Sequence, residues 1–213
     1  MSVAANLQDV RRRIADTGRD PNEITIVAVT KGFGPAKCQE ALDAGLTVLG
    51  ENRVQEALSK MEALRGATWH LIGHLQTNKV KPAAGKFELI QTVDSRHLAE
   101  SLAGANAEQQ VLVEVNVARK PQKSGVAPES AGPLIDLVAG VLNLRGVMAM
   151  GTADRDPMPA FNELRRLRDE AQERLGNSLP ILSMGMSGDF EVAVRAGSTM
   201  VRLGHVLFGP RPR

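Results

Sequence analysis

The feature that most constrains the fold is an alternation, repeated eight times, between a short apolar run and a longer helical stretch. The apolar runs are continuous instead of alternating in polarity, which is typical of parallel strands that are buried on both faces of a sheet. The stretches between them carry apolar residues at three- and four-residue spacing, as amphipathic helices do. Strands alternating with helices along the chain indicate an α/β protein with a parallel sheet.

Eight such units predict a closed (β/α)8 TIM barrel that forms a single domain over residues 1–213, with an extra N-terminal helix at residues 2–17. The expected strands lie at residues 24–30, 47–49, 68–72, 88–93, 110–117, 144–150, 180–184 and 199–203. The expected helices lie at residues 35–44, 54–64, from about 77, 95–103, 128–141, 157–175 and 189–196. A doubly wound open sheet is the alternative fold. It usually carries a Gly-rich dinucleotide turn after its first strand, which Lys31-Gly32-Phe33-Gly34-Pro35 does not match.

The charge balance, the length of the apolar runs and the cysteine content limit which partners the protein can have. The chain has 26 basic and 24 acidic residues, a balance too close to neutral to attract nucleic acid or a membrane surface. Its apolar runs are far shorter than the roughly 18 residues of a membrane span, and its start lacks the apolar core of a signal peptide. Cys38 is the only cysteine, so no internal disulfide can form. We expect a cytoplasmic protein that uses neither nucleic acid nor membrane, and, because no large apolar helix face stands out, a monomer.

Lys31 is the first candidate for chemistry, because barrel enzymes and binding proteins build their sites at the carboxyl ends of the strands. Side chains alternate along a strand, so Lys31 shares a face with Val29 and Val27, which we expect to point into the barrel. An ammonium group is costly to bury, and the neutral amine that replaces it can form a Schiff base with a carbonyl group. The alternative is that Lys31 extends past the strand end to solvent.

Two glycine-rich segments, residues 185–188 and 204–206, follow the last two expected strands. Barrels often bind phosphate with the loops after these strands and a helix N-terminus, where main-chain amides and the helix dipole favour an anion. Tight turns are the other common use of such glycines. An amine on the first strand with a phosphate site after the last two fits pyridoxal 5'-phosphate (PLP), held by an imine at one end and by its phosphate at the other.

Several longer stretches carry a resemblance to a known family. They are AVTK around Lys31, GENRVQEA from Gly50, WHLIGHLQTNKVK from Trp69, KSGV from Lys123, RGVMAMG from Arg145, LSMGMSGDFEVAVRAGSTMVRLG from Leu182 and LFG from Leu207. Together they resemble the pyridoxal phosphate homeostasis proteins, single-barrel relatives of the alanine racemase N-terminal domain. The resemblance implies PLP bound covalently to Lys31. It also implies a role in storing the cofactor and delivering it, with PLP-dependent apo-enzymes as partners, and no established catalytic turnover.

The same resemblance suggests roles for further residues. Ser187 and the amides at Gly204 and His205 would take the phosphate, although a small hydroxyl residue is common in the family where His205 stands. Arg202 matches the arginine that faces the pyridine nitrogen. A permanently cationic Arg202 would leave that nitrogen unprotonated and the ring a weak electron sink, which suits holding the cofactor better than reacting with it. Asn52 is a candidate for a hydrogen bond to the cofactor ring, or else a turn residue.

Two further candidates carry less weight. His70 and His74 lie four residues apart on an expected strand, a separation of about 13 Å that argues against a shared zinc ion. Lys123 is either a second amine able to accept the aldehyde or a solvated loop lysine, and the latter is the commoner case. We therefore expect no metal.

Three functions compete on the sequence alone. They are a non-catalytic PLP-binding protein, a fold-type III PLP-dependent amino-acid racemase or decarboxylase, and a Schiff-base aldolase without cofactor. Racemases of this fold use a lysine and a tyrosine on opposite faces of the cofactor, and the sequence contains no tyrosine. We also expect no second domain of the kind that completes a racemase site. The sequence therefore favours the binding protein.

Overall fold

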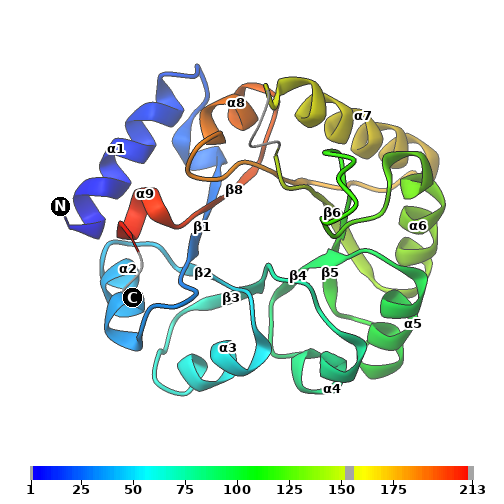
Figure 1. Cartoon of the computed structure of the whole chain (residues 1–213), viewed down its shortest axis with the longest axis horizontal. Helices are drawn as coiled ribbons and strands as arrows, with labels where there is room; N and C mark the ends of the chain where they lie inside the picture. Colours follow the sequence, from blue (N-terminus) through cyan, green and yellow to red (C-terminus); the bar gives the residue numbers. More distant parts are fainter. Residues whose placement is uncertain (1, 152–155, 211–213) are drawn as a thin grey trace.

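The computed structural model, which describes residues 2–151 and 156–210, shows a closed barrel of eight parallel strands surrounded by helices (Figure 1). The strands are β1 Thr25–Val29, β2 Val48–Glu51, β3 Thr68–Leu71, β4 Leu89–Val93, β5 Gln110–Glu114, β6 Asn143–Met148, β7 Ile181–Ser183 and β8 Met200–Leu203. Each strand pairs with the next along the chain, and β1 pairs with β8 to close the sheet. The predicted TIM barrel is confirmed.

The helices follow the predicted alternation. They are α1 Val3–Ala15, α2 Pro35–Asp43, α3 Val54–Met61, α4 Val80–Ala83, α5 Arg96–Ala105, α6 Pro128–Val141, α7 Met158–Leu175, α8 Phe190–Arg195 and α9 His205–Phe208, with short 3-10 helices at Pro21–Glu23 and Thr77–Lys79. The helix expected from about Thr77 starts there, but as a 3-10 turn, and α4 after it has only 4 residues. Among the described residues, no helix combines the length and the apolar character needed to cross a membrane.

The barrel has two apolar layers. Side chains on the outward face of the strands pack against the helices in one continuous core. A smaller cluster fills the inside of the barrel with one side chain each from five strands: Val27, Leu89, Leu112, Met148 and Met200. Because side chains alternate along a strand, residues two and four positions beyond a member of this inner cluster also point toward the inside of the barrel.

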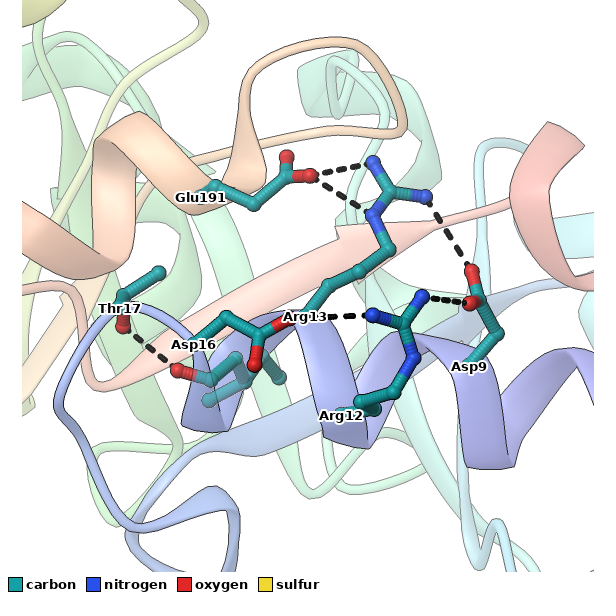
Figure 2. A network of polar contacts seen from close by, with 7 residues as sticks. Asp9, Arg12, Arg13, Asp16, Thr17 and Glu191 are labelled. Carbon is teal, nitrogen blue, oxygen red and sulfur yellow. Dashed lines mark hydrogen bonds and ion pairs between the residues drawn. The ribbon is translucent and has the colours of Figure 1, made fainter.

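Helix α1 lies across the outside of the barrel and holds the two helices that follow β7 and β8 (Figures 1 and 2). The Arg13 Nε donates to Glu191 Oε1 of α8 at 2.7 Å, and its guanidinium carbon lies 4.5 Å from the centre of the Phe190 ring. On the α9 side, Asn6 Nδ2 donates to the Leu207 carbonyl at 2.8 Å. The N-terminal helix therefore braces the segments that carry both glycine-rich loops.

Candidate functional site

A cavity of about 350 Å³ lies at the carboxyl end of the strands. All the residues predicted for the site line it: Lys31, Asn52, Ser187, Arg202, Gly204 and His205. They come from the ends of β1, β2, β7 and β8, which the closed barrel brings to one rim. A larger surface groove of about 560 Å³ lies between α4 and α5, but it contains none of these residues. The functional candidates of the sequence thus converge on one cavity.

Lys31 reaches this cavity because of its position relative to β1. Val27 belongs to the inner cluster, and Val29 and Lys31, two and four residues further on, line the cavity above it. Thr30 lies on the opposite face and is fully buried against the helix layer. The half-buried Lys31 side chain therefore contributes an amine to the cavity wall, as predicted.

Arg202 forms a buried, charged part of the cavity wall. It is only 5% exposed, and its guanidinium donates to Ser183 Oγ at 2.7 Å and to the Ala149 carbonyl at 2.9 Å. Burial lowers the pKa of Arg202 to about 10, while the carboxylates of Glu114 and Asp189 oppose this shift. Arg202 is therefore cationic at neutral pH and held from two sides, with the cavity in front of it.

A buried polar chain supports Arg202 from inside the barrel. Ser183 Oγ donates to Gln91 Oε1 at 2.7 Å, and Gln91 Nε2 lies 3.1 Å from His70 Nδ1. Burial lowers the pKa of His70 to about 4, so the ring is neutral and its Nδ1 accepts the proton of the Gln91 amide. From the sequence, His70 is considered only as a zinc ligand, and this buried role is not predicted. No group of three or more potential metal-ligating side chains occurs among the described residues.

The two glycine-rich loops meet at the cavity. The Val206 amide donates to Ser187 Oγ at 3.2 Å, which joins the loop after β7 to the start of α9. A hydroxyl group can accept this bond and still donate its own proton. His205 and Val206 are the first residues of α9, where position alone leaves amides without an acceptor inside the helix. This corner of the cavity has the donors that an anion requires.

The cavity is also lined by a carboxyl group that was not predicted from the sequence. Glu114 is 1% exposed and lines the cavity; its Oε1 accepts from Ser124 Oγ at 2.9 Å. Its Oε2 is buried with no hydrogen-bond partner among the described residues, and burial raises the pKa of the Glu114 carboxyl. The alternation from Leu112, an inner-cluster residue of the same strand, would have placed Glu114 in the cavity.

Two other predictions concern loop residues. Lys123 is half-buried, and its Nζ donates to the Gly151 carbonyl at 2.8 Å, so the preferred interpretation of Lys123 as a solvated loop lysine is wrong. It does not line the cavity. His74 lies after β3 with its Nδ1 3.3 Å from Asp94 Oδ2, and the two histidines share no metal site in the described part of the chain.

Comparison with known proteins identifies the family of this chain. Residues 2–212 match the family described as alanine racemase, N-terminal domain. The chain is 41% identical to the pyridoxal phosphate homeostasis protein of Aquifex aeolicus over 96% of this chain and 95% of that protein. It is 36% identical to the protein of the same name in Escherichia coli K12, over 98% of this chain and 97% of that one.

Solved structures agree. The structure of PipY from Synechococcus elongatus with PLP bound has a TM-score of 0.85 and 30% identity, and covers 98% of this chain and 100% of that chain. Alanine racemase from Corynebacterium glutamicum shares the fold with a TM-score of 0.78 and 15% identity, but this chain corresponds to only 61% of it. The chain therefore belongs to the alanine racemase N-terminal domain family and to the pyridoxal phosphate homeostasis proteins.

Proposed function

We propose that this protein binds pyridoxal 5'-phosphate in the cavity and takes part in PLP homeostasis by storing the cofactor and delivering it, without catalytic turnover of its own. The proposal rests on one observation: the amine of Lys31, the guanidinium group of Arg202 and the two glycine-rich loops line the same cavity. The relatives named for PLP homeostasis and the PLP-bound structure of PipY support it.

The donor set fits the chemical groups of PLP. Lys31 supplies the amine that holds the aldehyde. The hydroxyl group of Ser187 and the amides at Gly204 and His205 suit a phosphate, and Asn52 suits a polar group of the ring. When bound, PLP contributes an electron-accepting ring whose strength depends on the protonation of its pyridine nitrogen.

Arg202 determines that protonation. A guanidinium group only donates hydrogen bonds and stays charged, so a second positive charge on the ring nitrogen beside it is unfavourable. The contacts of Arg202 with Ser183 and Ala149 keep the guanidinium in place without neutralising it. The wall therefore favours retention of the cofactor over its use as an electron sink.

The test is to locate the covalent attachment. Borohydride reduction of the protein with PLP, followed by peptide mapping, should place the pyridoxyl group on Lys31. Lys31→Ala should lose the visible absorption band, and Lys123→Ala should keep it. A pyridoxyl group found only on another lysine would refute the assignment. A wild-type protein with no visible band would favour the cofactor-free aldolase.

Absence of turnover has its own test. The sequence contains no tyrosine to act as the second acid or base of a racemase. We expect no racemisation or decarboxylation of amino acids by the PLP-loaded protein. Turnover approaching the roughly 10 per second of an ordinary enzyme would contradict the storage role. We further propose that the protein acts as a monomer in the cytoplasm and hands PLP to PLP-dependent apo-enzymes.

A further inference from the structure

A buried ionic cluster lies directly beneath the turn that carries Lys31. Its centre is Lys60 of α3, which is 4% exposed. The Lys60 ammonium donates to Glu51 Oε1 at 2.6 Å, to Glu56 Oε1 at 2.8 Å and to the Thr30 carbonyl at 2.9 Å. All three ammonium protons are thus used within the protein, and Lys60 does not line the cavity. We name Lys60, Glu51 and Glu56 the Lys60 cluster.

The Lys60 cluster holds the main chain on both sides of Lys31. Before Lys31, the Thr30 carbonyl accepts from Lys60 and the Thr30 hydroxyl donates to Glu51 Oε1 at 2.6 Å. After it, the Gly32 amide donates to Glu56 Oε1 at 2.7 Å. Gly32 has a φ of 77°, a conformation that permits the sharp turn at this point. The residues immediately flanking Lys31 are therefore fixed by a single set of charges.

The charges in the cluster are complementary. Burial opposes the charge on Lys60, but its hydrogen bonds to Glu51 and Glu56 outweigh burial and raise the pKa of Lys60. Burial likewise opposes the charge on Glu56, but Lys60 and the Gly32 amide outweigh it and lower the pKa of that carboxyl. Burial raises the pKa of the Glu51 carboxyl. The cluster thus contains two carboxylate partners for Lys60, the fully buried Glu51 at 2.6 Å and the partly exposed Glu56 at 2.8 Å.

We propose that the Lys60 cluster is a positioning device that aims the Lys31 amine into the cavity. The inference rests on the proposed function, because Lys31 needs a fixed orientation only if its amine binds PLP in the cavity. General stabilisation alone does not account for the cluster, because well-packed apolar residues usually stabilise a core as well as a buried ion pair does. An ion pair adds fixed hydrogen-bond directions, and here those directions converge on the Thr30 carbonyl and the Gly32 amide.

Substitutions at Glu56 provide the sharpest test, because its side chain is 28% exposed and a change there should leave the fold intact. Glu56→Ala removes the acceptor of the Gly32 amide, whereas Glu56→Gln retains an oxygen for it. Lys60→Met removes the centre of the cluster. Glu40→Ala is the matched control, since it breaks the exposed Lys37–Glu40 pair on α2.

Two measurements separate positioning from stability. The first is the rate of PLP capture and release, followed by the visible band at a temperature where every variant is folded by circular dichroism. The second is the pH profile of acylation of Lys31 in the protein freed of cofactor, quantified by mass spectrometry. We expect Glu56→Ala and Lys60→Met to weaken PLP retention by about tenfold and to change the Lys31 profile. Glu56→Gln should restore most of both, and Glu40→Ala should leave both unchanged.

Folded Glu56→Ala and Lys60→Met proteins with wild-type capture, release and Lys31 profiles would overturn the positioning role. Failure of the wild-type protein to bind PLP would instead overturn the proposed function. In that case the acylation profile of Lys31 would still decide whether the Lys60 cluster orients the amine.

Discussion

At the scale of single residues, Ser187 and His205 make different kinds of contact with the same corner of the cavity. Ser187 offers a hydroxyl donor, while His205 offers the main-chain amide at the start of α9 and has an exposed side chain. A main-chain amide does not depend on the identity of its side chain. The family's usual hydroxyl residue at position 205 is therefore dispensable if the amide carries the contact.

The prediction is an unequal effect of two alanine substitutions. Ser187→Ala removes the hydroxyl group that we propose donates to the phosphate dianion. Such a hydrogen bond is worth roughly 1.5 to 3 kcal/mol, so the change should weaken PLP retention more than tenfold. His205→Ala should cost less than about 1 kcal/mol. Cofactor dissociation measured for both variants in one buffer compares them. A larger loss for His205→Ala would show that the imidazole ring itself binds the phosphate.

His70 gives a residue-scale prediction about pH. Its pKa falls from 6.5 to about 4 in the folded protein because it is buried. The unfolded chain thus takes up this proton at a higher pH than the folded protein does, so the free energy of unfolding falls as the pH drops from 6.5 toward 4. From pH 7 to pH 5, this difference should cost about 2 kcal/mol.

Urea unfolding at the two pH values measures this loss. His70→Gln keeps an acceptor for Gln91 but no longer titrates, so its loss should be smaller by about the same 2 kcal/mol. His97→Gln, on the exposed first turn of α5, is the control and should behave like the wild-type protein. Equal losses in the wild-type and His70→Gln proteins would assign the pH dependence to other groups.

Strand alternation explains which site residues could be predicted. Lys31 follows β1 and Arg202 lies within β8, each on the same face of its strand as an inner-cluster residue, so their place in the cavity is readable from the sequence. Glu51 shares a face with Leu49 and lies under α3, but a glutamate after a glycine at a strand end reads as a loop residue. Its partner Lys60 lies in a predicted helix, where a lysine is usually exposed to solvent. Only the packing of α3 on β1 and β2 identifies the pair.

At the scale of elements, the contact between the ends of β2 and β3 depends on Gly73. A β-carbon at Gly73 would lie 2.6 Å from Asn52 Cα and also clash with the Asn52 carbonyl oxygen. Both atoms belong to the main chain and cannot move aside without shifting the strand end. Gly73 therefore sets the position of Asn52 at the cavity.

We predict that Gly73→Ala lowers the free energy of unfolding by about 2 kcal/mol and also weakens PLP retention. Gly104→Ala is the matched control, because Gly104 is exposed in α5 with nothing within 4 Å of an added β-carbon. That change should raise the stability by about 0.5 kcal/mol. Denaturant unfolding of both variants tests the pair, and an unaltered Gly73→Ala protein would show that the strand ends can separate freely.

The elements themselves were largely predictable because most strands lie in mainly apolar runs, and α1, α2, α5, α6 and α7 have a capping residue or a proline at their start. The differences arise where polar contacts end a strand early. The strand expected at residues 110–117 stops at Glu114, and Asn116 then donates to the carbonyls of Lys120 and Lys123 at 2.8 and 3.2 Å. The local sequence does not reveal such a loop, since the apolar pattern continues through Val117.

At the scale of the whole molecule, the proposed monomer gives a prediction about mass. Among the described residues, the large apolar side chains that are clearly exposed are Val141 at 37% and Met186 at 36%, and Met186 lines the cavity. A stable dimer normally buries an extended apolar patch. We predict the mass of one chain in sedimentation equilibrium, with and without PLP. A concentration-dependent doubling of that mass would contradict the monomer.

Closure of the barrel by β1 and β8 also fixes when the site comes into existence (Figure 1). A ribosome makes Lys31 early and Arg202 late, and at 5 to 20 residues per second roughly ten to thirty seconds separate them. During that interval the two loops after β7 and β8 are not yet both made, and β1 lacks its neighbour β8. A nascent chain therefore has an amine but no place for a phosphate. If the protein stores PLP as proposed, uptake belongs to finished molecules alone, so the storage capacity follows the number of completed barrels and not the rate of translation.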